Sequence, residues 1–373
     1  MMAKLIRNIG GGAALVLYSM LARAEYAINL QQPETPIANQ IFHLHTLILW
    51  VCVGIFVVVF GAMFYSIIKH RKSAGHKAAH FHENTTVEII WTIVPFFILM
   101  GMAWPATQTV LAMRDTSAPD MTVKVTGYQW KWEYDYQKEG IKFISNLSTP
   151  RDQIDNKAVK GEHYLLEVDN PMVVPTGKKI RVLLAANDVI HAWWVPAFGV
   201  KQDAIPGFIK DVWFKVDKPG IYRGQCAELC GKDHGFMPIV VEAREPAEYA
   251  KWVAAEQAKL AAAAQNADKV YALAELKAMG EKVYATNCVA CHQANGQGIP
   301  NVFKPLDGSP IVKGPKLAHA EIVLNGKTGT AMQAFGKQLS DTDIAAVVTY
   351  ERNSWSNNTG DAVQPSEIKA LRK

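Results

Sequence analysis

The sequence has little net charge and no basic run with interleaved aromatic residues. Its 39 lysines and arginines are opposed by 34 aspartates and glutamates, which leaves a formal charge of +5. Nucleic-acid-binding chains carry a basic patch or stripe, so this balance argues against a nucleic-acid partner. The cationic side chains are spread along the chain and are expected to form a solvated surface.

Cysteine is scarce as well, and its placement is uneven. The 373 residues contain five cysteines, of which four form two close pairs, Cys226 with Cys230 and Cys288 with Cys291; the fifth is Cys52. Close pairs in an exported protein can be disulfides, so each pair is judged below from the residues around it. The length is enough for two or three domains.

The first 24 residues have the features of a signal peptide. Lys4 and Arg7 precede an apolar stretch, and Ala22-Arg23-Ala24 fits the small-x-small cleavage pattern. The mature chain is then expected to begin at Glu25, with an uncleaved membrane anchor as the alternative.

Two apolar runs, of about residues 44–68 and 87–111, are each long enough to cross a bilayer. A basic cluster from Lys69 to Lys77 lies between them, and short basic loops favour the cytoplasmic side. Residues 25–113 are therefore predicted to form a transmembrane hairpin in a bacterial inner membrane, with both mature termini and all later residues on the periplasmic side. Glu88, at the entrance of the second run, is either an interfacial charge or a proton-entry group.

From residue 114 to residue 243, short β-rich runs alternate with turn signals. The expected strands are Met121–Tyr128, His163–Val168, Lys179–Ala185, Asp211–Val216, Gly220–Gln225 and Pro238–Glu242. Proline-glycine pairs separate several of these runs. Many short strands at this spacing predict a β-sandwich or a β-barrel.

A cluster of metal-binding residue types follows the fifth of these runs. Cys226, Cys230, His234 and Met237 lie within twelve residues, and His191 lies on an earlier loop. Soft sulfur ligands together with imidazole favour copper over hard ions, whereas zinc sites prefer four cysteine or histidine ligands. Two bridging cysteines can hold two metal ions close together. The alternative, a disulfide, would leave His234 and Met237 unexplained.

The segment Cys226–Met237 resembles the copper A loop of the cytochrome c oxidase subunit II family. Asp188–Trp193 and Lys201–Gly207 are similar to that family's first-histidine loop, and Val87–Pro95 is similar to the start of its second membrane helix. The resemblance implies a cupredoxin-like β-barrel with a dinuclear copper A centre. The implied copper ligands are His191, Cys226, Cys230, His234, Met237 and the backbone carbonyl of Glu228.

The same resemblance implies roles for three further positions. The Glu228 side chain would point to a magnesium or manganese ion shared with subunit I. Glu88 would match the glutamate that the family places at a proton-channel entrance. Trp130, in the aromatic run Tyr128–Tyr134, would be the surface entry point for electrons, and its alternative role is packing at a strand end.

The remaining chain is predicted to contain a tether and a second redox domain. Residues 244–268 are rich in helix formers and predict a semi-rigid helical linker. Residues 269–356 are predicted to form an all-α domain, and residues 357–373 a loose tail. Cys288-Val289-Ala290-Cys291-His292 is the attachment signal of a covalent c-type haem, since a simple redox pair gives no reason for the adjacent histidine. This domain resembles class I cytochrome c.

The sixth ligand of the haem iron is expected downstream of His292. Met332 lies about forty residues later in a loop of small residues, and methionine opposite histidine raises the haem potential. The alternatives are His319, which is expected at the surface, and no sixth ligand at all. A final helix is expected from about Asp341 to Trp355.

These features together predict a multidomain membrane protein that serves as the electron-input subunit of a respiratory haem-copper oxidase. A soluble cytochrome c or similar donor would deliver electrons to the haem, and these would pass to copper and then to subunit I. Two membrane spans cannot house the site of oxygen reduction, so a larger partner is implied. This partner, subunit I, would reduce oxygen to water and translocate protons. Subunit III is a further expected partner.

Three other classes of protein remain as alternatives. A quinol oxidase subunit has the same shape but dispenses with the copper ligands. Nitrous oxide reductase uses the same copper motif, but it needs a separate large catalytic domain. A two-span membrane anchor is not expected in that enzyme. A non-enzymatic electron shuttle or copper-delivery protein would give no reason for the matches at Glu88 and Glu228.

Overall fold

The computed structural model describes residues 29–75, 77, 82–265 and 269–372. The predicted signal peptide, residues 1–24, lies outside this part of the chain. The described residues fall into two compact units: residues 38–110, with the segment before residue 34, form one, and residues 34–37 with 111–372 form the other. The second unit contains both a β-rich region and the C-terminal helices.

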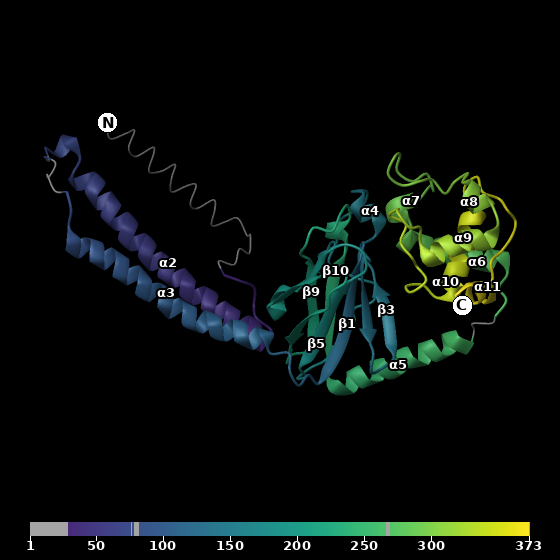
Figure 1. The fold of residues 1–373 in the computed structure, drawn as a ribbon, viewed down its shortest axis with the longest axis horizontal. Coiled ribbons are helices and arrows are strands. Elements are labelled where there is room, and N and C mark those ends of the chain that lie inside the picture. Colours follow the sequence, from purple (N-terminus) through teal and green to yellow (C-terminus); the bar gives the residue numbers. More distant parts are fainter. Residues whose placement is uncertain (1–28, 76, 78–81, 266–268, 373) are drawn as a thin grey trace. The chain divides into compact units, whose positions relative to one another are not determined.

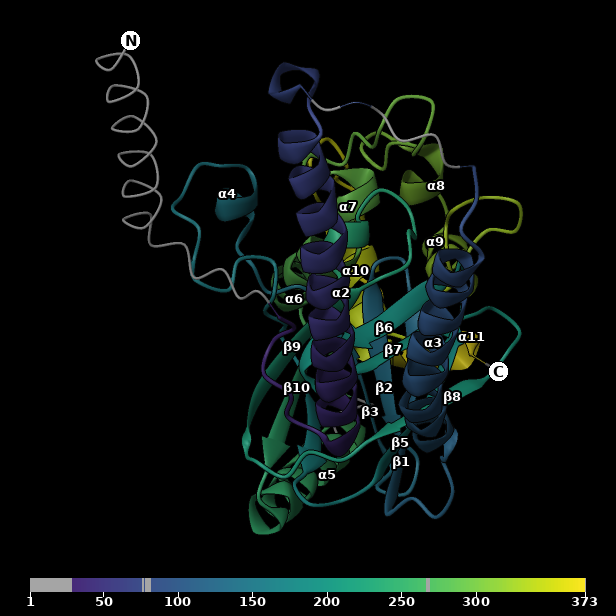
Figure 2. The same ribbon diagram turned by 90° about the vertical axis from the view of Figure 1, so that its left-hand side faces the viewer.

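The first unit is a helical hairpin (Figure 1). Helix α2, Pro36–Lys69, has 34 residues and α3, Thr85–Arg114, has 30, which exceeds the roughly 20 residues needed to span a bilayer. Both are long and apolar enough to be membrane spans and contain the two predicted runs. Where the first turns of α2 approach the last turns of α3, Asn39, His43 and Gln108 help to line a common pocket. Figure 2 shows the two helices from another side.

The β-rich part of the second unit, residues 114–244, is here called the β domain. Its strands are β1 Met121–Tyr128, β2 Lys131–Tyr136, β3 Ile141–Ser145, β4 Met172–Pro175, β5 Ile180–Ala186, β6 His191–Val195, β7 Val200–Ala204, β8 Lys210–Phe214, β9 Gly220–Cys226 and β10 Pro238–Arg244. They form two five-stranded sheets, in the orders β3-β2-β1-β5-β8 and β4-β10-β9-β6-β7. Trp132, Tyr134, Trp193, Phe198 and Phe214 are fully buried in the core. This is the cupredoxin-like architecture expected from the sequence.

One predicted strand is wrong and five observed strands were not predicted as such. His163–Val168 forms turns rather than a strand, with hydrogen bonds from Tyr164 N to Gly161 O and from Leu166 N to His163 O. Local bonds of this kind satisfy backbone groups that a strand would offer to a neighbour. The strands β2, β3, β4, β6 and β7 are short, and short runs give a weak periodic signal.

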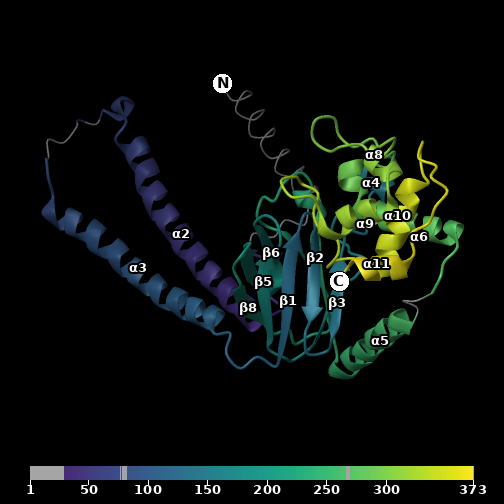
Figure 3. The same ribbon diagram turned by 45° about the vertical axis from the view of Figure 1, so that its right-hand side comes forward.

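The predicted tether is helical, but its first half packs on the β domain. Helix α5, Pro246–Gln265, places Tyr249, Trp252 and Val253 against the core of the sheets. The ring of Trp252 lies 5.2 Å from that of Tyr136. Apolar residues three and four positions apart share one helix face, so the start of α5 is anchored. Figure 3 shows α5 beside β3.

The C-terminal helices, residues 269–372, are here called the helical domain. They are α6 Leu273–Asn287, α7 Val289–His292, α8 Pro310–Lys313, α9 Lys316–Asn325, α10 Asp341–Arg352 and α11 Pro365–Leu371. Helices α6 and α10 cross at Gly280, where an added Cβ would lie 2.0 Å from the carbonyl oxygen of Ala346. Only glycine permits so close a crossing.

The expectation of a loose tail at residues 357–373 is corrected by the structure. Helix α11 lies within this segment, and Val363 and Ile368 are fully buried in the core of the helical domain. Arg352, itself 3% exposed, forms an ion pair with Asp361. The segment is therefore part of the domain, because it completes the apolar core behind α10.

Candidate metal centre and haem site

Strand register brings the first histidine to the first cysteine. His191 and Trp193 lie on the same face of β6, since residues two apart in a strand point the same way. Trp193 pairs with Cys226 at the end of β9, and Ala227 N donates to Ala192 O at 3.0 Å. The imidazole Nδ1 of His191 consequently lies 4.0 Å from the Cys226 sulfur.

The loop after β9 returns four more donor atoms to the same place. The sulfurs of Cys226 and Cys230 are 3.8 Å apart, well beyond the roughly 2.05 Å of a disulfide bond. The Cys230 sulfur lies 3.4 Å from His234 Nδ1 and 3.6 Å from the Met237 sulfur. The Cys226 sulfur lies 3.4 Å from the carbonyl oxygen of Glu228. All the donor groups predicted for the copper centre therefore meet.

This donor set fits soft metal ions. His191, Cys226 and Cys230 are buried, and their ligand atoms lie within 4.8 Å of one another. Two thiols, two imidazoles, a thioether and a carbonyl suit copper, whereas magnesium and calcium prefer oxygen donors. The side chain of Glu228 is exposed.

The two thiols titrate as a coupled pair. The hydrogen bond that Cys230 donates lowers the pKa of Cys226 to about 3. That same bond, together with burial and the charge of the Cys226 thiolate, raises the pKa of Cys230. Two like charges at this separation disfavour each other. A bound cation would remove this repulsion, so the pair is suited to hold positive charge between its sulfurs.

Two residues support His191 in ways that the sequence did not reveal. The Asp188 carboxylate lies 2.8 Å from His191 Nε2, which leaves Nδ1 for the sulfur side. Burial lowers the pKa of His191, but hydrogen bonds to Asp188 and Cys226 outweigh it and the net pKa is raised. Gly127 of β1 faces the ring, and an added Cβ there would lie 2.8 Å from His191 Cδ2. The position of Asp188, three residues before His191, was the signal in the sequence that could have indicated this support.

The predicted electron-entry residue, Trp130, touches the segment Cys226–Met237, here called the metal-binding loop. Gln129 and Trp130 connect β1 to β2, and with Lys131, the first residue of β2, they are here called the 129–131 turn. The Trp130 indole N–H and the Gln129 side-chain amide both donate to the carbonyl of Cys230, at 3.1 and 2.9 Å. Trp130 is half-buried. Surface electron entry, the role that the resemblance implies for Trp130, stays a prediction, as does the alternative of packing at a strand end.

The haem-attachment signal forms a short helical turn. Cys288 and Cys291 are unpaired and partly buried, with α7 between them and His292 at its end. His292 Nδ1 lies 3.0 Å from the carbonyl oxygen of Lys304. A histidine that donates from Nδ1 has Nε2 free as a metal donor, so these residues fit a covalent haem with a histidine ligand.

The two candidates for the sixth ligand lie in different environments. Met332 is partly buried against the core of the helical domain and lies in a loop held by the bond from Lys327 N to Met332 O at 2.9 Å. The expectation that His319 is a surface residue is wrong. It is 3% exposed, and its Nε2 lies 2.9 Å from a Glu351 oxygen, because a buried imidazole requires a polar partner.

Glu88 lies in the first turn of α3, as the sequence indicated. Its carboxylate accepts a hydrogen bond from Asn84 N at 3.3 Å. A carboxylate at this end of a helix is stabilised by the exposed N–H groups. The contact gives Glu88 a structural role beside the proton-entry role implied by the resemblance.

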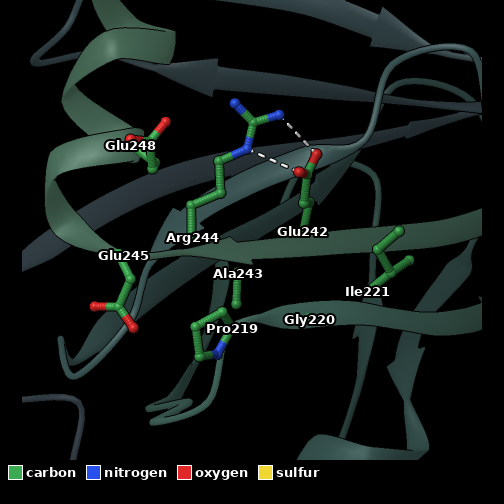
Figure 4. Close-up of a pocket in the computed structure, with 8 residues that line it drawn as sticks. All are labelled: Pro219, Gly220, Ile221, Glu242, Ala243, Arg244, Glu245 and Glu248. Atoms are coloured by element: carbon green, nitrogen blue, oxygen red, sulfur yellow. Dashed lines mark hydrogen bonds and ion pairs between the residues drawn. The ribbon is translucent and has the colours of Figure 1, made fainter.

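A surface hollow of about 600 Å³ lies apart from these donor groups. It is lined by Glu242, Arg244, Glu245 and Glu248 among others, and Glu242 holds Arg244 at 2.8 Å (Figure 4). Met237 precedes β10 and Arg244 ends it. Seven residues of strand separate the two ends by roughly 20 Å, so the hollow is not part of the metal centre.

Comparison with known proteins identifies each part of the chain. Three family profiles match. "Cytochrome C oxidase subunit II, transmembrane domain" covers residues 23–109, "Cytochrome C oxidase subunit II, periplasmic domain" covers residues 121–244, and "Cytochrome C oxidase, cbb3-type, subunit III" covers residues 275–350. The matched segments overlap the helical hairpin, the β domain and the helical domain, respectively. The periplasmic-domain match implies the copper A centre, and the third match implies haem.

Relatives extend the likeness beyond single domains. A probable cytochrome c oxidase subunit 2 of Rickettsia bellii is 35% identical over 266 residues, which cover 70% of this chain and 97% of the relative. Cytochrome c oxidase subunit 2 of Cereibacter sphaeroides is 38% identical over 242 residues, 61% of this chain and 79% of the relative. The crystal structure of the periplasmic domain of subunit II of Bradyrhizobium japonicum cytochrome oxidase is 46% identical, covers 38% of this chain and 96% of that chain, and has a TM-score of 0.34. The chain belongs to the cytochrome c oxidase subunit II family, with a cytochrome c domain at its C-terminal side.

Proposed function

We propose that the chain is the electron-input subunit of a respiratory haem-copper oxidase. It accepts electrons through a covalent haem c and a dinuclear copper A centre and passes them to subunit I. Subunit I then reduces oxygen to water, coupled to proton translocation. The observation that carries the proposal is the meeting of the six copper donors in a chain that also bears the haem-attachment signal.

The β domain holds the copper pair in this proposal. Cys226, Cys230, His191, His234, Met237 and the Glu228 carbonyl would hold the copper, with the two thiolates and the two imidazoles as its principal donors. Copper in such a site supplies one-electron redox chemistry. Because the donors lie on strand ends and a packed loop, the protein holds them in place and limits their movement when charge changes.

The helical domain holds the haem in this proposal. Cys288 and Cys291 would attach the haem covalently, and His292 and Met332 would be the ligands of its iron. The Lys304 carbonyl orients His292, which fixes its tautomer and ring position. A methionine ligand paired with a histidine raises the potential of the haem. A haem that accepts electrons from a soluble cytochrome c or a similar donor requires such a potential.

The chain's surroundings follow from the same family. Subunits I and III are the proposed partners, and the redox domains face the periplasm of a bacterial inner membrane. The exposed carboxylate of Glu228 would bind a magnesium or manganese ion shared with subunit I. Glu88, at the opposite end of α3 from the β domain's start, would mark a proton-channel entrance. Trp130 would be the electron-entry residue of the copper domain.

Metal and haem content test the proposal most directly. The purified complex should contain two coppers and one haem c for each copy of this chain, and it should take up oxygen when supplied with reduced cytochrome c. A single copper, or zinc in its place, would contradict the copper A assignment. Oxygen uptake from a quinol but not from reduced cytochrome c would favour the quinol oxidase alternative.

A further inference from the structure

A histidine and a glutamate form a buried pair inside the helical domain. His319 of α9 and Glu351 of α10 are each 3% exposed, and the imidazole Nε2 lies 2.9 Å from a carboxylate oxygen of Glu351. Val347 and Val348, one turn earlier on α10, are buried in the apolar core. Ionisable side chains are almost never buried this completely unless they are paired, so the contact between the two side chains permits their burial.

The pair is electrically neutral only when it holds one proton. A carboxylate without a counter-charge is costly in an apolar core. Two cations of the same helices are engaged elsewhere in the domain. Arg352 is paired with Asp361 at 2.7 Å, and Lys316 is paired with Glu367 at 2.9 Å. A proton on either member of the buried pair is therefore the charge that balances its carboxylate.

This proton is not fixed in place, unlike the charge of Arg352. Nδ1 of His319 is buried and meets no hydrogen-bond partner among the residues that the structure describes. A doubly protonated imidazole would therefore leave one N–H group unsatisfied. The guanidinium of Arg352, in contrast, donates to the Gly314 carbonyl at 2.8 Å as well as to Asp361, and arginine does not lose its proton in proteins. The buried pair is thus a site that can gain and release a proton.

Glu351 lies next to the first cysteine of the haem-attachment signal. The Cys288 thiol donates a hydrogen bond to the Glu351 carboxylate. Burial, and after it the charge of this carboxylate, raises the pKa of the thiol. Once Cys288 is bonded to haem, its sulfur has no proton to donate, and the carboxylate keeps His319 as its partner. The pair then lies beside the haem attachment in an apolar core, where one charge acts strongly on another.

Three other ionisable groups lie near Glu351 or Cys288. Tyr284 of α6 and Tyr350 of α10 are affected by the charge of Glu351, and burial raises the pKa of each phenol above its ordinary value. Both phenols therefore stay neutral near pH 7 and do not compete for the proton. Lys131 of the β domain acts on Cys288, and burial lowers its pKa to about 8. Below this range Lys131 keeps a constant charge.

We propose that His319 and Glu351 form a proton-binding site that is coupled to the haem and takes up one proton from water when the haem gains an electron. This inference rests on the proposed function for the presence of the haem. The electron and the proton arrive together, so the total charge of the domain is unchanged, and oxidation releases both. Because the bound proton offsets the charge of the added electron, the haem accepts an electron more readily at low pH.

The redox equilibrium of the haem, followed against pH, tests the coupling. The haem c of the purified complex is titrated spectroelectrochemically between about pH 5 and pH 7, below the titration of Lys131. At a fixed electrode potential, the ratio of reduced to oxidised haem should fall by roughly tenfold as the pH rises across this range. Glu351→Gln keeps the shape of the side chain and removes its charge. In this variant the ratio should change by less than about twofold.

A second pair variant and two controls complete the experiment. His319→Leu combined with Glu351→Leu replaces the buried pair by apolar side chains, a change that is often neutral or stabilising, and it should also remove the pH-dependence. Lys316→Gln combined with Glu367→Gln removes a partly exposed ion pair of the same domain and should leave the pH-dependence intact. Lys131→Met removes the nearby lysine of the β domain and should also leave it intact.

The outcomes separate this inference from the proposed function. If the ratio is equal at both ends of the pH range in the unaltered chain, the coupling is wrong even where copper and oxygen uptake are found. If the ratio changes equally in the unaltered chain and in both pair variants, the proton binds elsewhere, such as on the carboxylates of the haem, and the inference is again wrong. If copper is absent while the pair variants remove the pH-dependence, the proposed function fails and the proton site stands.

Discussion

The copper-binding region and the haem-binding region reach their geometry in different ways. In the β domain, backbone pairing between β6 and β9 sets the position of His191 against Cys226, and every donor lies on a strand end or a packed loop. In the helical domain, the attachment signal is one turn of helix, and Met332 lies on a separate loop packed against the core. The first site is assembled by the sheet, whereas the second is divided between two segments.

This difference indicates what each site needs from its cofactor. The copper donors are within contact distance of one another through protein packing alone, so the metal is expected to enter a nearly formed site. The predicted haem residues lie on two separate segments, and a covalently attached haem would itself join them. Removal of copper should therefore leave the β domain folded, whereas removal of haem should loosen the loop that bears Met332.

The largest expected effect is the loss of a bridging thiol. Cys226→Ser should abolish the dinuclear centre and lower the rate of electron delivery by more than about a hundredfold. Loss of a residue that only supports a metal ligand costs about 10–100-fold, and Cys226 is itself a proposed ligand. Metal analysis and the copper absorption spectrum are the measurements. Cys52→Ser, which alters a cysteine of α2 outside the site, is the control. A variant at Cys226 that keeps two coppers would show that the thiols do not bridge.

A smaller effect is expected from crowding the ring of His191. Gly127→Ala would put a Cβ within 2.8 Å of the imidazole, and overpacking of this kind typically costs about 1–3 kcal/mol. Copper affinity should fall by roughly tenfold, measured by competition with a copper chelator. Gly235→Ala, inside the metal-binding loop but with open space around it, should bind copper normally. Equal affinities for the two variants would mean that the sheet does not fix His191.

Local motifs made the donor groups predictable from the sequence, but not their supports. Cys226–Met237 is a short segment, so its spacing alone indicated a sulfur-rich metal site. Asp188 and Gly127 reach His191 only through strand pairing, and pairing between distant segments depends on register that no local pattern reports.

The errors in the helical domain have the same cause. The segment 357–373 is polar and shows little apolar periodicity. Nevertheless, Val363 and Ile368 fill the core behind α10. His319 sits on α9 among apolar residues, and only the fold brings Glu351 to it. Tertiary packing buries both the segment 357–373 and His319. The periodicity of the sequence does not indicate such burial for isolated residues.

The haem-binding region can be probed through its divided ligand pair. Met332→Leu keeps an apolar side chain of similar volume but removes the sulfur donor, so the haem potential should fall by roughly 0.1 V within the wide range that axial ligands span. Spectroelectrochemical titration measures it. Met279→Leu, a partly buried methionine of α6, should leave the potential unchanged. A constant potential in the Met332 variant would assign the sixth position to another residue.

The smallest effect concerns the contact between the β domain and the helical domain, where the Lys131 ammonium donates to the Asn287 side chain at 3.1 Å. Burial lowers the pKa of Lys131 from 10.5 to about 8, against the opposing charges of Cys288, Asp188, Glu133 and Asp169; a thioether at Cys288 would remove that charge. When the domains separate, water restores the ordinary pKa. Between about pH 8 and pH 10.5 the separated state therefore binds more protons, and the docked state gains stability as the pH rises.

Intramolecular electron transfer reports this gain. The rate from haem to copper, followed after a flash, should rise roughly threefold from pH 7 to pH 9.5, since the docked population grows with the loss of the buried charge. Lys131→Met keeps the apolar stem and removes the titrating group, so its rate should be flat over this range. Lys138→Met, at an exposed position, should keep the slope. A slope that persists in Lys131→Met would place the titrating group elsewhere and separate the contact at the 129–131 turn from any pH-dependence of the copper or haem region.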